Sequence, residues 1–192
     1  SKAIQLYQRA ADLGHTNAMV HLASHNLEGV GVTQDKSKAF QLYQTASDLG
    51  NIDAVVNLGV CYLKGYGVAQ DKSKAFQIFQ RVAKIGNTHA MFYLAVCYEK
   101  GDGVSQDKSK AIRFYQKAAN LNNIEAIFSL ALCYLKGDGV TQDKFKAIKL
   151  YQKASDLGNT RAMVILALCY WNGDGVTQNK SKTIQLFQQA SD

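Results

Sequence analysis

The sequence predicts an all-α fold, a solenoid built from 36-residue helix-turn-helix repeats. The first observation is a Gly-x-Gly-Val tetrapeptide that recurs every 36 residues, beginning at Gly29, Gly65, Gly101, Gly137 and Gly173. The second is that apolar residues on both sides of the tetrapeptide recur with helical spacing. The third is the absence of proline, so that no helix is interrupted by one. Such repeats bury their apolar faces against their neighbours, which favours an extended binding surface over an enclosed catalytic pocket.

Residues 51–86 show how one repeat is built. Asn51 follows a glycine and is predicted to cap a first helix, whose apolar stripe consists of Ala54, Leu58, Gly59 and Tyr62. Gly65 ends this helix, and Asp71 lies where a first-turn acid stabilises a second helix. The inner face of the second helix consists of Ala75, Ile78, Phe79 and Val82. The unit is therefore a helical hairpin that Gly86 closes.

Applied along the chain, this pattern predicts a single domain over residues 1–192. A second helix without a first-helix partner, residues 1–14, comes first. Five hairpins follow, at residues 15–50, 51–86, 87–122, 123–158 and 159–192. Because the chain begins and ends inside the pattern, we expect a fragment of a longer array. Solenoids need polar caps, so either further repeats flank it or its ends associate with one another.

Charge and hydropathy narrow the classes of partner. The net charge is +7, and its excess comes from residues 73–180, without the dense basic stripe and stacking aromatics of a nucleic-acid binder. We therefore expect a protein or peptide partner and no nucleic acid. No apolar run approaches the ~18 residues that span a bilayer, so no membrane span is expected. The first residues already belong to a repeat, and no signal peptide is visible.

The four cysteines occupy one equivalent position per repeat, at Cys61, Cys97, Cys133 and Cys169. Stacked helices lie about 8–10 Å apart, which is too far for a disulfide between equivalent positions. The cysteines are therefore expected to be free and buried. Unpaired thiols favour a cytoplasmic protein, with secretion as the alternative.

The sequence contains no recognisable catalytic or metal-binding motif. His21 and His25 have the i, i+4 spacing of a zinc pair but lack the glutamate of a metalloprotease motif. Asp102, Asp138 and Asp174 lie in Gly-Asp-Gly turns that offer one carboxylate each, fewer ligands than calcium needs, so their expected role is a left-handed turn. The sequence predicts no catalytic residue, no metal site and no cofactor, and hence no enzyme.

The residues Ala90, Leu94, Tyr98, Gly101, Gly103, Val104, Asp107, Lys110 and Ala111 are similar to the pattern of the Sel1-like repeat family, a relative of the tetratricopeptide repeat. The match recurs along the whole chain. Three positions depart from the pattern: His25-Asn26 replaces Cys-Tyr, Thr183 replaces an alanine, and Asn122 replaces the closing glycine. The resemblance implies a right-handed α-solenoid that serves as a protein-interaction scaffold or adaptor. A secreted or surface module that contacts a host, which could include glycan binding, is the alternative.

In tetratricopeptide-like solenoids the first helices line the concave groove, and the resemblance places the partner site there. One row of first-helix positions varies between repeats, and three rows beside it are mostly apolar; we call these four rows the first-helix stripe. The variable row holds Asp53, His89, Glu125 and Arg161. The others hold Val56, Phe92, Phe128 and Val164, then Val60, Val96, Leu132 and Leu168, then Leu63, Glu99 and Trp171.

Two interpretations stay open for the apolar rows. They bind the partner, with the outward-facing aromatics Phe92, Phe128 and Trp171 as anchors, or their valines and leucines pack between adjacent hairpins. The second helices carry a separate basic stripe that includes Lys110, Arg113 and Lys117. We expect it to be a solvated convex face, with an anion-binding patch as the alternative.

Overall fold

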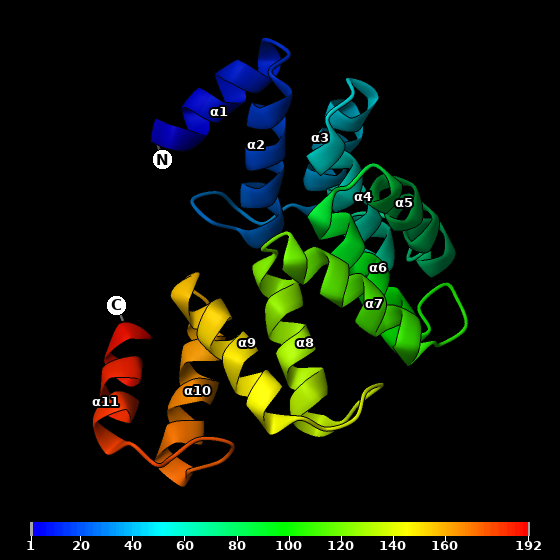
Figure 1. The fold of residues 1–192 in the computed structure, drawn as a ribbon. Coiled ribbons are helices and arrows are strands. Elements are labelled where there is room, and N and C mark those ends of the chain that lie inside the picture. Colours follow the sequence, from blue (N-terminus) through cyan, green and yellow to red (C-terminus); the bar gives the residue numbers. More distant parts are fainter. Residues whose placement is uncertain (1, 192) are drawn as a thin grey trace. The chain divides into compact units, whose positions relative to one another are not determined.

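The computed structural model describes residues 2–191, so Ser1 and Asp192, the outermost residues of the expected repeats, lie outside the described residues. These residues form eleven α-helices and no strand (Figure 1), which confirms the all-α expectation. The helices are α1 (Lys2–Asp12), α2 (Thr16–Glu28), α3 (Lys36–Asp48), α4 (Ile52–Lys64), α5 (Lys72–Lys84), α6 (Thr88–Lys100), α7 (Lys108–Asn120), α8 (Ile124–Lys136), α9 (Lys144–Asp156), α10 (Thr160–Asn172) and α11 (Lys180–Gln189). Within the described part of the chain, none of them combines the length and the apolar character that a membrane crossing requires.

Polar caps start both helices of a repeat. Asn51 accepts a hydrogen bond at 2.9 Å from the backbone N–H of Ala54, which confirms the expected cap of α4. Asp71 caps α5 in the same way, accepting at 2.8 Å from the N–H of Lys74. The sequence placed Asp71 inside the first turn, but its extended backbone puts it just before the helix, where a side-chain oxygen satisfies an unpaired N–H. The equivalent asparagines and aspartates cap the other hairpins, except that His15 makes no such bond before α2.

The Gly-x-Gly-Val loop is closed by hydrogen bonds to the end of the first helix. Gly65 has a φ of 71°, a left-handed conformation that ends α4, and its N–H donates to the Cys61 carbonyl at 2.8 Å. The Gln70 side chain donates to the Leu63 carbonyl at 2.8 Å. The Asp71 N–H donates to the Tyr62 carbonyl at 2.9 Å. These bonds fix the direction in which the second helix leaves the loop.

The same loop contacts the hairpin before it. Asp102 and Lys72 form an ion pair at 2.8 Å, and Asp138 and Asp174 pair with Lys108 and Lys144, each at 2.6 Å. The expected left-handed turns are confirmed, because the glycines that flank the aspartates have positive φ values. The ion pairs of the carboxylates with the preceding repeat are a contact that the sequence did not predict. A Cβ on Gly103 would collide with the backbone of Lys72, so glycine is required where the loop meets the helix start.

In the hairpin of α4 and α5, a small residue of the first helix packs under an aromatic ring of the second. Gly59 of α4 faces Phe79 of α5, and a Cβ on Gly59 would lie 2.6 Å from that ring. Phe79, Tyr115 and Tyr151 occupy one repeat position on the second helices and are among the largest fully buried side chains. The close approach of two helices across glycine or alanine is therefore what buries these rings.

The three departures from the repeat pattern are accommodated locally. Asn122 has a φ of 59° and is, among the described residues, the one non-glycine residue with positive φ. Asparagine tolerates this conformation, so it replaces the closing glycine. The buried Thr183 hydroxyl donates to the Asn179 carbonyl at 2.9 Å. The rings of His21 and His25 lie beside Tyr7 rather than forming a ligand pair, with ring centroids 5.2 and 5.9 Å from that of Tyr7.

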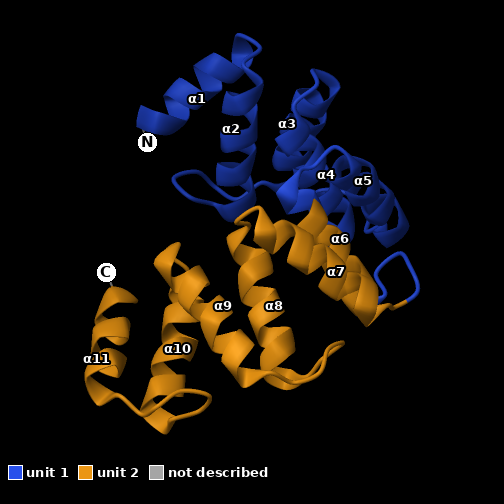
Figure 2. Ribbon diagram, viewed as in Figure 1, with its two compact units in different colours: residues 1–90, 100–105 blue, residues 91–99, 106–192 orange. Residues whose placement is uncertain are grey.

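The chain divides into two compact units (Figure 2). Unit 1 comprises Ser1–Ala90 and Lys100–Ser105, and unit 2 comprises Met91–Glu99 and Gln106–Asp192. In unit 1, α2 packs against α1 and α3, and α4 packs against α3 and α5. In unit 2, consecutive helices from α7 to α11 pack against one another. Within each unit, these helices contact their neighbours in sequence, as expected for a repeat array.

Candidate functional site

The variable row of the first-helix stripe is exposed. Asp53, His89, Glu125 and Arg161 all lie at the second position of their helices, α4, α6, α8 and α10. Their side chains are available to a partner. Arg161 also has a structural contact, because its guanidinium lies over the Phe128 ring, 4.5 Å from the ring centroid.

The apolar rows are more buried than the sequence predicted. Phe128 is only 6% exposed, Val56 5% and Leu63 2%. The expectation that Phe128 faces outward is wrong, whereas for Val56 and Leu63 the sequence had left burial open. The Phe128 ring meets Tyr151 of its own hairpin edge-on, at 5.7 Å between centroids, and is covered on another side by Arg161 of the next hairpin. The alternative, that these rows pack between hairpins, explains these three residues.

The middle of the stripe is half-buried. Phe92 contacts Tyr115, with ring centroids 5.9 Å apart, and Val60, Val96 and Leu132 are also half-buried. Glu99 accepts a hydrogen bond at 3.2 Å from the Tyr115 hydroxyl. Burial first, and the Glu99 carboxylate second, raise the pKa of Tyr115 above its ordinary value. Glu99 thus links α6 to α7 through this hydrogen bond in addition to belonging to the first-helix stripe.

Three predicted residues on α10 form an exposed apolar strip. Val164, Leu168 and Trp171 are 36%, 47% and 49% exposed, and their spacing of i, i+4 and i+7 places them on one face. Lys180 covers one part of the indole, with its Nζ 5.6 Å from the ring centroid. This α10 strip is the part of the predicted site where large apolar side chains reach the surface.

The basic second-helix stripe is more organised than a solvated face. In four hairpins a second-helix lysine lies over the first-helix tyrosine, with Nζ 4.1 to 5.4 Å from the ring centroid. The pairs are Lys74 with Tyr62, Lys110 with Tyr98, Lys146 with Tyr134, and Lys182 with Tyr170. In the first hairpin the tyrosine is replaced by Asn26. The recurrence of tyrosine and lysine at the 36-residue period could have revealed these lysine–tyrosine pairs.

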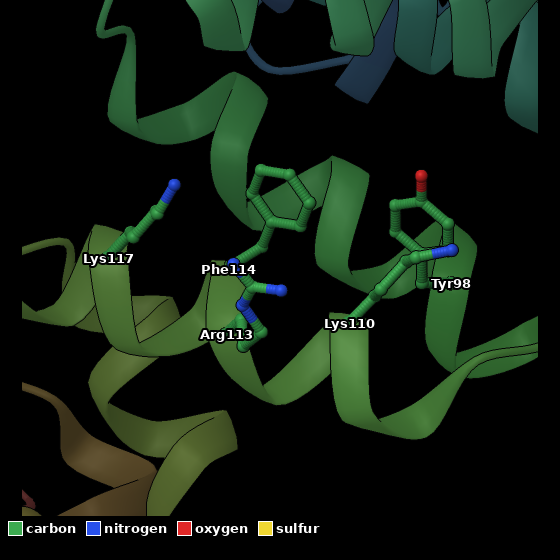
Figure 3. Close-up of a pocket in the computed structure, with 5 residues that line it drawn as sticks. All are labelled: Tyr98, Lys110, Arg113, Phe114 and Lys117. Atoms are coloured by element: carbon green, nitrogen blue, oxygen red, sulfur yellow. The ribbon is translucent and has the colours of Figure 1, made fainter.

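Each unit has a pocket that such a lysine–tyrosine pair lines, and the two pockets occupy equivalent repeat positions. The α5 pocket, in unit 1, has a volume of about 520 Å³, and the residues it shares by position with the second pocket are Tyr62, Lys74, Gln77, Ile78 and Arg81. The α7 pocket, in unit 2, has a volume of about 230 Å³ and is lined by Tyr98, Lys110, Arg113, Phe114 and Lys117 (Figure 3). The α7 pocket thus differs in carrying an arginine for Gln77 and an aromatic ring for Ile78.

The rings and cations of the α7 pocket are arranged in a regular way. Tyr98 of α6 and Phe114 of α7 are stacked, with an interplanar angle of 5° and centroids 5.9 Å apart. Lys110 and Lys117 lie over Tyr98 and Phe114, at 5.4 and 5.5 Å from the ring centroids (Figure 3). Arg113 projects beside Phe114. Sequence reasoning named these cations, with an anion-binding patch as the alternative to a solvated face, but it missed the stacked rings of Tyr98 and Phe114 beside them.

The four cysteines are buried and form no disulfide, as the sequence predicts. Burial raises the pKa of Cys61 and of Cys133 to about 11, and it also raises the pKa of Cys169. At neutral pH these three thiols are protonated and poor nucleophiles. Within residues 2–191, no three His, Cys, Asp or Glu side chains come together as a potential metal site.

Comparison with known proteins identifies the repeat. The Sel1 repeat model matches residues 1–15, 16–51, 52–87, 88–123, 124–159 and 160–192. No curated protein sequence matched the chain. Among solved structures, a Sel1 repeat protein from Oxalobacter formigenes is 27% identical with a TM-score of 0.86, over 98% of this chain and 76% of that one.

Two further solved structures resemble the chain. A protective antigen of uropathogenic Escherichia coli strains, which displays an SLR fold, is 33% identical with a TM-score of 0.73 over 96% of this chain. The present chain spans only 40% of that protein's length. Cysteine rich protein B of Helicobacter pylori is 28% identical with a TM-score of 0.54, over 69% of this chain and 96% of that one. Sel1 repeat proteins are generally protein-interaction scaffolds without catalytic activity, and this chain belongs to the Sel1 repeat family.

Proposed function

We propose that this chain is a non-catalytic scaffold that binds a protein or peptide partner through its first helices. The observation that carries the proposal is the α10 strip, where Val164, Leu168 and Trp171 expose apolar surface within a repeat family of interaction scaffolds. Exposed apolar patches mark interaction sites. The protonated, buried cysteines support the non-catalytic part of the proposal.

The α10 strip and the variable row have different roles in binding the partner. Trp171 and Leu168 provide apolar contact area, and tryptophan is the residue type most enriched among interface anchors. Glu125 and Arg161 are exposed charges of opposite sign in the same unit, and such charges set the register and orientation of a partner. We propose that Phe128, which is 6% exposed and covered by Arg161, supports this surface instead of anchoring the partner.

The test uses Trp171, the single tryptophan of the chain. A photo-crosslinking amino acid at Val164 should capture the partner from an extract of the source cells, whereas the same group at Lys149 on α9 should not. With the captured partner purified, binding should shift the Trp171 emission to shorter wavelength, because the indole leaves water. Equal capture at both positions, or no change in emission, would refute this site.

A matched pair of variants measures the anchor. Trp171→Ala should weaken partner binding by at least ~2 kcal/mol, the cost of truncating a true anchor. Phe145→Ala, which removes an exposed aromatic ring from α9 in the same unit, should leave binding unchanged. If both variants bind as tightly as the parent chain, the partner does not use the α10 strip.

A surface-exposed protein that contacts a host is a second candidate. It is favoured by the 33% identity, over 96% of this chain, to the protective antigen of uropathogenic Escherichia coli. In that case, antibodies against this chain should label intact source cells, and labelling only after permeabilisation would eliminate this candidate.

A further inference from the structure

The α7 pocket concentrates positive charge on one side of one helix. Lys110, Arg113 and Lys117 occupy positions i, i+3 and i+7 of α7 and line the pocket together (Figure 3). All three side chains are exposed. The stacked rings of Tyr98 and Phe114 form the apolar part of the same pocket.

Two of these cations form no ion pair within residues 2–191. Lys110 pairs with Asp107 at 3.2 Å, but among the described residues no ion pair involves Arg113 or Lys117. Other lysines of the second helices are engaged: Lys108 and Lys144 pair with loop aspartates at 2.6 Å. The charge of the α7 pocket is therefore available to an anion from outside the described chain.

The size of the pocket limits what can occupy it. Its volume of about 230 Å³ lies below the roughly 300–1,000 Å³ of typical small-molecule sites. A pocket of this size accommodates one or two side chains of a peptide that continues across the surface. The combination of cations with a stacked aromatic wall matches carboxylates next to an apolar side chain.

We propose that the α7 pocket binds an acidic segment of a protein partner. The Arg113 guanidinium donates two hydrogen bonds to one carboxylate of the segment, and Lys117 and Lys110 pair with the neighbouring carboxylates. An apolar side chain of the segment lies against Phe114. This inference rests on the proposed scaffold function, since it assumes a protein partner, but it assigns a second surface on the other helix of the repeat.

The α5 pocket provides an internal comparison. It carries Gln77 and Ile78 where the α7 pocket carries Arg113 and Phe114. Its Lys74 is hydrogen-bonded to the Tyr62 hydroxyl at 2.8 Å. The double variant Arg113→Gln, Phe114→Ile therefore gives the α7 pocket residues that this fold already accommodates at the same repeat position.

The experiment measures fluorescence anisotropy with a dye-labelled hexapeptide, Glu-Glu-Leu-Glu-Glu-Phe, on the full chain. The double variant and the single variant Arg113→Gln should each bind it at least tenfold more weakly. Arg81→Gln, the matched control in the α5 pocket, should bind it as the parent chain does. Circular dichroism of each variant verifies that the fold is intact. Binding should weaken as salt rises, because the charges are exposed.

Three outcomes would overturn the inference. The first is that the double variant binds the hexapeptide as tightly as the parent chain does, and the second is that the parent chain binds a peptide with Gln in place of each Glu equally tightly. The third is that inorganic phosphate or a short single-stranded oligonucleotide displaces the labelled hexapeptide at a lower concentration than the unlabelled peptide does. The last would assign the pocket to phosphate groups. Trp171→Ala should leave hexapeptide affinity unchanged. Hexapeptide binding therefore tests the α7 pocket alone, and the Trp171 variant with the captured partner tests the α10 strip alone.

Discussion

Replacing Phe128 with alanine should destabilise unit 2. The ring is almost fully buried, meets Tyr151 edge-on at 5.7 Å and is covered by Arg161 at 4.5 Å. These contacts belong to two consecutive hairpins, so the substitution opens a cavity at their junction.

The magnitude follows from burial. Truncating a buried phenylalanine to alanine costs about 3–5 kcal/mol, because apolar contact is lost and the cavity does not fully collapse. The lost contact with the Arg161 guanidinium contributes ~0.5–1 kcal/mol of this at an exposed cation. Arg161 is mobile enough to fill part of the space, since its side chain is exposed. We therefore expect a loss of about 3 kcal/mol in the free energy of unfolding.

Urea denaturation, followed by far-ultraviolet circular dichroism and by Trp171 emission, measures the change. Because repeat arrays can unfold in stages, the midpoints from the two probes are compared before a free energy is assigned. The matched control is Val164→Ala, at the same repeat position one hairpin later, where the side chain is exposed. It should cost about 1 kcal/mol or less.

A loss below ~1 kcal/mol for Phe128→Ala would refute this account of the hairpin junction. Normal stability together with lost partner binding would return Phe128 to the role of an anchor on the first-helix stripe. Reduced stability with unchanged affinity of the folded protein would establish it as a core residue.

Three further predictions concern the loops, the thiols and the caps. Gly103→Ala should lower the free energy of unfolding by at least ~2 kcal/mol in urea, because its Cβ would meet the Lys72 backbone and its φ is 74°; a loss no larger than that of Gly86→Ala, which has open space, would contradict this. All four thiols should resist alkylation at neutral pH until the chain is unfolded, since they are buried and Cys61 has a pKa of about 11; an adduct on the folded chain would contradict this. Hydrogen bonds from the Lys110 backbone and side chain hold the pKa of Asp107 below its ordinary 3.8, so its stabilising effect is present at neutral pH and is lost as the pH falls through the acid range. Asp107→Asn should therefore reduce the fall of the urea midpoint between about pH 7 and pH 3, and an unchanged pH dependence would contradict the assignment.

The sequence predicts the helices well because the signals that define them are local. Glycine at Gly65 and asparagine at Asn51 act on the backbone within a few residues, and the structure confirms both. The error at Asp71 is one of position within a turn, since an acid before the helix and one inside it look alike in sequence.

The site was harder to predict because its contacts join residues of different repeats. Phe128 and Trp171 are both large, apolar and on first helices. The sequence does not show that Tyr151 and Arg161 pack on Phe128 while Trp171 stays 49% exposed. Periodicity alone does not distinguish packing within a hairpin from packing between hairpins. The ion pair of Lys108 with Asp138 spans 30 residues, and no local pattern predicts it.

The ion pairs between loops and helix starts affect how repeats can be added to the array by gene duplication. Residues 123–158 carry both halves of the contact, Asp138 in the loop and Lys144 at the helix start. A tandem duplicate of this segment would therefore set Lys144 of the first copy against Asp138 of the second, with no new complementarity to evolve. We expect a chain with this segment duplicated to fold and to gain helical circular dichroism in proportion to its added length; an aggregated or partly helical product would contradict this. Unequal recombination, which copies whole repeats, thus yields an array whose new junction already fits.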